Sequence, residues 1–97
     1  MWILRSTDAE SSVMFRLVNG SSKTLGRAPI ADFILDAALV SRVHCRLTAG
    51  ADALNVEDLA STNGTFVNDR RIETGQLASG DRLRLGRVEL TVEQLNH

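Results

Sequence analysis

The stretch Leu25–Asn68 reads LGRAPIADFILDAALVSRVHCRLTAGADALNVEDLASTNGTFVN, and three short motifs in it interrupt runs of alternating apolar residues. The motifs are Gly26-Arg27, Ser41-Arg42-Val43-His44 and Ser61-Thr62-Asn63-Gly64-Thr65. Each offers groups suited to an anion, namely a guanidinium, hydroxyls, a side-chain amide or flexible backbone. If the motifs lie on loops that converge at one end of a small β domain, they supply the donors that a phosphate requires.

Alternation of apolar and polar residues dominates the whole chain, and helical spacing is hard to find. The alternating segments are Trp2–Arg5, Val13–Val18, Cys45–Thr48, Leu54–Glu57, Leu83–Leu85 and Val88–Glu93. Half-polar strands of this kind belong to antiparallel sheets with one solvated face. Turn signals such as Asn19-Gly20 and Asn68-Asp69 separate them, and Asp8–Ser12 is expected to form a hairpin tip. Many short strands at close spacing predict one all-β domain over residues 1–97, a sandwich or a barrel.

Composition and charge narrow the classes of function. Apolar residues make up 43% of the 97, which supports a true core, and the net charge of −1 without a basic block argues against a nucleic-acid partner. No apolar run approaches the roughly 20 residues that span a bilayer, so no membrane partner is expected. Cys45 is the only cysteine, which favours an intracellular, cytoplasmic setting. Because it alternates with Leu47, Cys45 is expected in the core.

Ser41 and His44 raise the alternative of a hydrolase in which the serine attacks and the histidine is the base. Such a site needs a buried acid to orient the imidazole and an oxyanion hole nearby. Only Asp36 and Asp58 are close in sequence, and the chain has no G-x-S-x-G elbow, so we expect no enzyme. The other histidine, His97, is terminal, and no metal or other cofactor is expected.

Taken together, the three motifs resemble the forkhead-associated (FHA) domain, whose members read phosphorylated motifs. The resemblance lies in Gly26-Arg27, Ser41-x-x-His44 and Asn63-Gly64, in that order and at roughly those intervals. Longer strings fit as well, namely Thr24–Arg27, Val40–Cys45, Asp58–Asn68 and the late Gly80-Asp81. The resemblance covers nearly the whole chain. It implies an antiparallel β-sandwich of about eleven short strands (SMAD/FHA-like), with the ligand site on loops at one end.

The resemblance also implies a non-catalytic module that recognises phosphothreonine-containing proteins or peptides in phosphorylation-dependent signalling. The residues implied to contact the phosphopeptide are Arg27, Ser41, Arg42, Thr62 and Asn63. In that arrangement Arg27 pairs with the phosphate, while Ser41 and Thr62 donate hydroxyl hydrogen bonds to it. Arg42 contributes its backbone N–H, and Asn63 holds the peptide main chain. The residues implied to shape the loops are Gly26, His44 and Gly64.

Target selection and one alternative function stay open. The candidates for reading residues that flank the phosphothreonine are Leu39, Val40 and Arg42. The alternative is a β-sandwich that uses a sheet face to bind an unphosphorylated partner or itself. An exposed apolar patch that includes Met14, Val18 or Ile3 would support it. In isolation the chain is expected to be a monomer.

Overall fold

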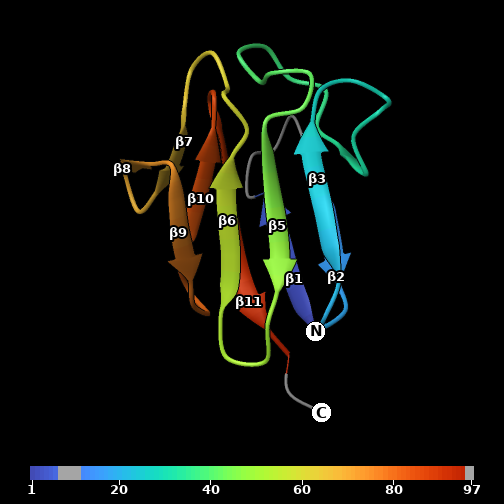
Figure 1. Cartoon of the computed structure of the whole chain (residues 1–97), viewed down its shortest axis with the longest axis vertical. Helices are drawn as coiled ribbons and strands as arrows, with labels where there is room; N and C mark the ends of the chain where they lie inside the picture. The colour runs from blue at the N-terminus through green and yellow to red at the C-terminus, as the bar shows by residue number, and fades with distance from the viewer. Residues whose placement is uncertain (7–11, 96–97) are drawn as a thin grey trace.

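The computed structural model describes residues 1–6 and 12–95 and folds them into eleven strands (Figure 1). The strands are β1 (Trp2–Ser6), β2 (Met14–Leu17), β3 (Ser22–Gly26), β4 (Phe33–Ile34), β5 (Cys45–Ala49), β6 (Leu54–Asp58), β7 (Thr65–Val67), β8 (Arg70–Ile72), β9 (Thr74–Leu77), β10 (Arg82–Leu85) and β11 (Val88–Gln94). In this described part, no helix is long and apolar enough to span a bilayer. The expected hairpin tip Asp8–Ser12 falls, apart from Ser12, outside the described residues.

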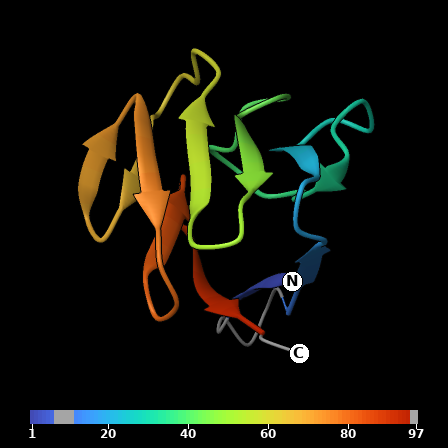
Figure 2. The ribbon, with the colours of Figure 1, turned by 60° about the horizontal axis from the view of Figure 1, so that its bottom comes forward.

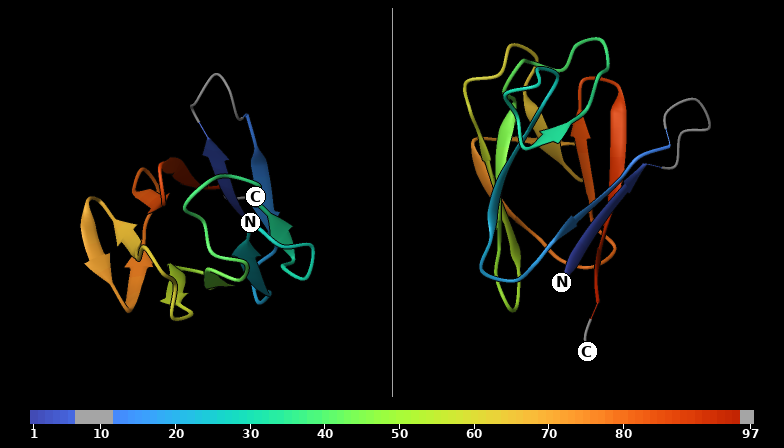
Figure 3. Two further views of the ribbon diagram at one scale, coloured as in Figure 1. Left: turned by 90° about the horizontal axis from the view of Figure 1, so that it is seen from above. Right: turned by 90° about the vertical axis from the view of Figure 1, so that its right-hand side faces the viewer.

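The strands form two sheets that pack face to face. The six-stranded sheet has the order β2-β1-β11-β10-β7-β8, and the five-stranded sheet has the order β4-β3-β5-β6-β9. All paired neighbours run antiparallel except β3 and β4. The right-hand view of Figure 3 shows the two layers side by side. At one side of the sandwich, the rings of Phe15 on β2 and Phe33 on β4 stack with centroids 4.9 Å apart. The predicted antiparallel β-sandwich is confirmed.

Aliphatic side chains fill the space between the sheets. The fully buried leucines are Leu4, Leu17, Leu25, Leu35, Leu47, Leu54, Leu77, Leu83, Leu85 and Leu90. Cys45 is buried beside them, as its alternation with Leu47 predicts. Burial raises the pKa of the Cys45 thiol to about 12, so this thiol stays protonated at neutral pH. The indole N–H of Trp2 donates to the Gly50 carbonyl oxygen at 2.8 Å, which satisfies the only polar group of that buried ring.

The alternation predicted for β1 is confirmed, because Trp2 and Leu4 face the core, but Ile3 on the opposite face is buried as well. This residue is only 5% exposed. In the sheet register, Ile3 lies between Arg16 on β2 and Glu93 on β11. Long charged side chains at such positions cover apolar neighbours with their methylene groups. Ile3 is therefore no part of an exposed apolar patch.

The two ends of the sandwich differ in what they carry. The β3–β4, β4–β5 and β6–β7 loops gather at one end, at the top of Figure 1. At the other end, the Leu95 N–H donates to the Met1 carbonyl oxygen at 2.8 Å, and Figure 2 shows the start of the chain beside the end of β11. The Asn68-Asp69 turn joins β7 to β8 with φ angles of 49° and 70°, so the predicted tight hairpin turn is confirmed.

Candidate functional site

The end of β3 lies directly against the β4–β5 loop. The Arg27 N–H donates to the Ser41 carbonyl oxygen at 2.9 Å, and the Ala28 N–H donates to the Arg42 carbonyl oxygen at 3.1 Å. A Cβ atom at Gly26 would lie only 2.2 Å from that Arg42 oxygen. Glycine is therefore required here because two backbones approach more closely than any side chain permits.

The Arg27 side chain is oriented by one hydrogen bond to the neighbouring loop. Its Nε–H donates to the Val40 carbonyl oxygen at 3.1 Å. Within the described residues, the terminal amino groups of this guanidinium form neither a hydrogen bond nor an ion pair. The planar fork is thus held at one corner while its other donors remain available to an anion.

A buried histidine joins the β4–β5 loop to the β6–β7 loop. His44 Nδ1 accepts a hydrogen bond from the Ser41 N–H at 3.0 Å, and its Nε2 lies 2.8 Å from the Gly64 carbonyl oxygen. Since Nδ1 accepts, Nε2 carries the proton and donates to Gly64. The backbone of His44 extends the connection, because its carbonyl oxygen accepts from the Leu59 N–H at 2.9 Å.

Asp58 holds the β6–β7 loop from within. Its carboxylate accepts hydrogen bonds from the backbone N–H and the hydroxyl of Ser61, and from the Thr65 hydroxyl at 2.7 Å. Burial raises the pKa of Asp58, but these hydrogen bonds, with a smaller contribution from His44, outweigh it and leave the pKa below its ordinary value. The Ser61 oxygen in turn accepts from the Gly64 N–H at 3.0 Å, so the carboxylate and the serine fix the loop together.

Two further hydrogen bonds cross between the loops. The Ser41 Oγ accepts from the Thr62 N–H at 3.0 Å, and the Asn63 side-chain amide donates to the Leu39 carbonyl oxygen at 3.0 Å. Because the Ser41 oxygen already accepts, its hydroxyl hydrogen is left to donate toward solvent or a ligand. Three segments distant in sequence are thereby locked to one another.

A pocket of about 660 Å³ opens where these loops meet. Its lining includes all five residues that the sequence implied as phosphopeptide contacts: Arg27, Ser41, Arg42, Thr62 and Asn63. Seen from above in the left-hand view of Figure 3, the loops surround this end of the sandwich. The remaining wall comes from the β4–β5 loop, from Asp36 to Val40. Two guanidinium groups and two hydroxyls therefore share one opening with a single carboxylate, that of Asp36.

The geometry opposes a hydrolase at Ser41. Both ring nitrogens of His44 are bonded to backbone groups, one to the Ser41 N–H and the other to Gly64, so neither can take the Ser41 hydroxyl proton. Among the described residues, no group of His, Cys, Asp and Glu is arranged to hold a metal ion. The arrangement instead presents donors that suit a bound oxyanion.

The β4–β5 loop contains features that the motifs did not predict. Leu39 is 47% exposed and has a left-handed φ of 71°, which is strained for a leucine. The Asn63 amide donates to the Leu39 carbonyl oxygen, and Gly86 lies close by, since a Cβ atom at Gly86 would be 3.0 Å from the Leu39 Cβ. The candidate Val40 is buried at 3% exposure and offers the pocket only its backbone. Of the three candidate flank readers, Leu39 and Arg42 have exposed side chains.

Known proteins of similar sequence and structure share this fold. GarA, the glycogen accumulation regulator of Mycobacterium tuberculosis, is 35% identical over 74 residues, which are 76% of this chain and 46% of GarA. The FHA domain of FhaA, solved in complex with the intracellular domain of Rv3910, matches with a TM-score of 0.85 and 36% identity over 96% of this chain and all of that domain.

A second solved structure, from a study of phosphothreonine-dependent FHA domain interactions, matches with a TM-score of 0.89 and 35% identity, covering 99% of this chain and 98% of the other. The chain spans about half the length of GarA. The family model of the FHA domain matches residues 23–86, from β3 to the turn after β10. The chain therefore belongs to the FHA domain family.

Proposed function

We propose that this domain is a non-catalytic module that binds phosphothreonine peptides in the pocket between the β3–β4, β4–β5 and β6–β7 loops. The observation that carries the proposal is the convergence of Arg27, Ser41 and Thr62 on one opening, from three separate loops. A phosphate near pH 7 carries roughly −1.5 to −2 charge and three acceptor oxygens, which matches this set of donors.

Each residue has a distinct part in the proposed complex. The Arg27 fork pairs with the phosphate, and the hydroxyls of Ser41 and Thr62 donate to it. Arg42 adds its backbone N–H, and Asn63 holds the peptide main chain while its amide also braces Leu39. Charge-assisted hydrogen bonds contribute about 1.5–3 kcal/mol each. After the cost of ordering a peptide, a few such bonds leave an affinity on the order of micromolar, which is reversible as signalling requires.

The relatives support a regulatory role of this kind. One solved FHA domain comes from work on phosphothreonine-dependent interactions, and the FhaA domain was solved with a protein partner. GarA is named a regulator, and a relative from Corynebacterium jeikeium, 34% identical over 74 residues, is named an oxoglutarate dehydrogenase inhibitor. These names describe proteins that act on other proteins or pathways.

Titration calorimetry with a phosphothreonine peptide library tests the proposal. We expect micromolar binding of phosphorylated peptides and none of the same peptides with unmodified threonine. Arg27→Ala should weaken binding by about 100-fold or more, because it removes charge-assisted bonds to the phosphate. The matched control is Arg46→Ala, which removes an arginine paired with Glu57 on the outer sheet face, at 3.3 Å, and should leave binding unchanged. Absence of phosphate-dependent binding throughout the library would refute the proposed function.

A further inference from the structure

A row of basic and aromatic side chains crosses the outer face of the six-stranded sheet near the loops. In the register of the sheet, Phe66 on β7 lies between Arg71 on β8 and Arg84 on β10. Side chains at directly opposed positions share one face, so the three are neighbours. The Arg84 guanidinium lies 4.1 Å from the centre of the Phe66 ring, which is a cation–π contact.

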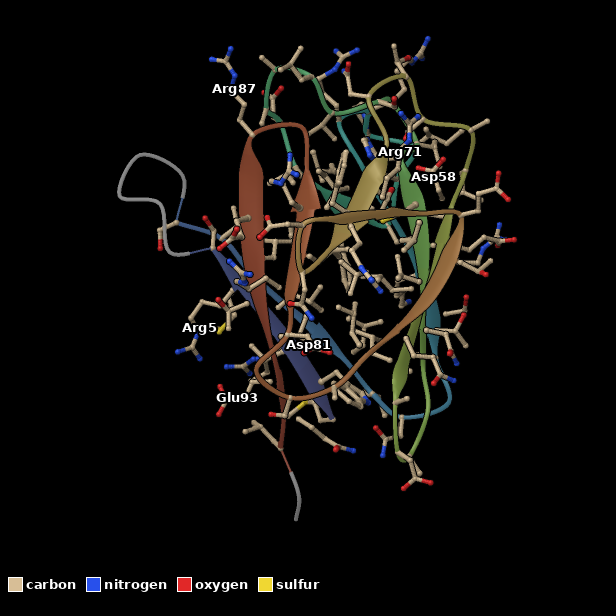
Figure 4. All side chains as sticks on the ribbon, turned by 90° about the vertical axis from the view of Figure 1, so that its left-hand side faces the viewer. Arg5, Asp58, Arg71, Asp81, Arg87 and Glu93 are labelled. Carbon is tan, nitrogen blue, oxygen red and sulfur yellow. The ribbon has the colours of Figure 1, made fainter. Side chains whose placement is uncertain are left out.

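Arg71 connects this row to the pocket. A Cβ atom at Gly64 would lie 2.8 Å from the Arg71 Nε and 3.1 Å from its Cζ, so the guanidinium rests against the glycine backbone. Gly64 follows Asn63, which lines the pocket. Figure 4 shows Arg71 at the same end of the sandwich as the loops. Arg71 therefore packs against the β6–β7 loop, next to a residue that lines the pocket.

The row carries positive charge that the protein itself leaves unpaired. In the described part of the chain, neither Arg71 nor Arg84 forms an ion pair. Glu89 lies opposite Arg84 across the β10–β11 pair, but its carboxylate is 3.8 Å from Arg82. Arg82 also lies 3.2 Å from Asp69. Among the described residues, the exposed Arg71 and the half-buried Arg84 thus flank an aromatic ring without an ion-pair partner, which suits an acidic segment.

We propose that an acidic segment of the same phosphorylated partner, contiguous with its phosphothreonine, binds along Arg71 and Arg84. The inference rests on the proposed function and extends the contact beyond the pocket. The carboxylates of the segment pair with the two guanidinium groups, and its methylene groups cover the Phe66 ring. An extended chain advances about 3.3 Å per residue. A segment of about four acidic residues next to the phosphothreonine is therefore roughly 13 Å long, which is the length we assign to the part that runs toward Arg71 and Arg84.

Fluorescence anisotropy with three labelled phosphopeptides tests the inference. One peptide has neutral flanks, and the others add about four glutamates before or after the same core. With the native domain, one extension should tighten binding about 10-fold in low salt, and the gain should shrink as salt is added. Arg71→Gln and Arg84→Gln should each reduce the gain in affinity about three-fold, so that the acidic extension tightens binding only about three-fold. Neither variant should change the affinity for the neutral peptide. Arg16→Gln, an equal change of charge on β2 of the same sheet, should retain the full gain.

The outcomes separate the inference from the function on which it rests. Equal loss of the gain in all three variants would mean that only net charge matters and would overturn the acidic site. Failure of both extensions to tighten binding, while the neutral phosphopeptide still binds, overturns the inference alone. An Arg71→Gln domain that loses affinity equally for all three peptides assigns Arg71 to the phosphate instead and also overturns it. No binding of any phosphopeptide refutes the proposed function as well.

Discussion

The loop end of the sandwich carries the β3–β4, β4–β5 and β6–β7 loops, and the turn end carries the β7–β8 and β9–β10 turns. Both ends are fixed by similar hydrogen bonds, but their arginines differ in whether they are paired with carboxylates. At the turn end, the Asn68 Oδ1 accepts from the Arg82 N–H at 2.9 Å, and the Asp81 carboxylate accepts from the Ala78 N–H at 2.8 Å. The Arg82 guanidinium there is within 4 Å of two carboxylates, those of Asp69 and Glu89. The charge of Arg82 is thus balanced by neighbouring carboxylates.

At the loop end, polar side chains again fix the backbone, but within residues 1–6 and 12–95 neither Arg27 nor Arg71 forms an ion pair. His44 joins two loops and Asp58 fixes the β6–β7 loop from within, while Arg27 lines the pocket. Figure 4 shows Arg71 and Arg87 at this end and Asp81 toward the other. The comparison teaches that His44 and Asp58 fix the loops without facing the pocket, whereas Ser41 and Asn63 fix the loops and also line the pocket beside Arg27.

Replacement of one glycine at each end gives the largest expected contrast. Gly26→Val should lower the free energy of unfolding by about 4 kcal/mol, since the new side chain would enter the space of the Arg42 carbonyl. Gly80→Ala, at the turn end, meets nothing within 4 Å and should cost only about 1 kcal/mol for its φ of 93°. Urea denaturation measures both. Similar losses would show that the close approach at Gly26 relaxes easily.

The bridging side chains provide the next contrast. His44→Ala removes a buried ring and leaves the Ser41 N–H and the Gly64 carbonyl without partners, so we expect a loss of about 3 kcal/mol. Asn68→Ala breaks exposed hydrogen bonds to Arg82 and Asp81 and should cost about 1 kcal/mol. Thermal or urea unfolding reports stability, and a phosphopeptide titration reports binding. Asn68→Ala should bind normally, and a binding defect there would contradict the division between the two ends.

The acid dependence of stability sharpens the role of Asp58. Its pKa is lowered in the folded state, so its ionised form stabilises the fold above the unfolded value of 3.8. That contribution is lost as the pH falls through the lower folded value. Asp58→Asn should therefore be less stable by about 1 kcal/mol at pH 7, with weaker hydrogen bonds to Ser61 and Thr65, and the difference should narrow below about pH 4. Urea denaturation across this range measures it. If the free energies of unfolding of the two proteins changed in parallel with pH, the negative charge of Asp58 would contribute nothing to stability.

Much of the fold follows from local sequence, because a strand with one buried face leaves a period-2 trace that needs no tertiary information. The burial of Ile3 on the outer face is explained by its neighbours on two other strands, Arg16 and Glu93, which no local pattern contains. The antiparallel arrangement follows in the same way from short strands separated by turns such as Asn68-Asp69. The choice of a sandwich over a barrel came only with the family resemblance.

The candidate site was visible as ordered motifs, whereas its internal bracing was not. The role of Asp58 depends on Ser61 and Thr65 folding back to it, and only the Asp58-x-x-Ser61 spacing, which is typical of side-chain-to-backbone turns, hinted at this. The left-handed φ of Leu39 had no local signal, because the residues that contact it, Asn63 and Gly86, lie far along the chain.

The hydrogen bond between Met1 and Leu95 has a consequence for how the domain can be used. Because the two residues lie side by side, polypeptide attached before β1 or after β11 would leave the domain at the same place. That place is at the end of the sandwich opposite the pocket (Figure 1). Such a domain can be attached to a linker, a surface or a neighbouring domain through either terminus of its chain, and its binding loops stay exposed to solvent. A linker on one side then sets only how far the pocket can reach, and with it the local concentration of any partner held nearby.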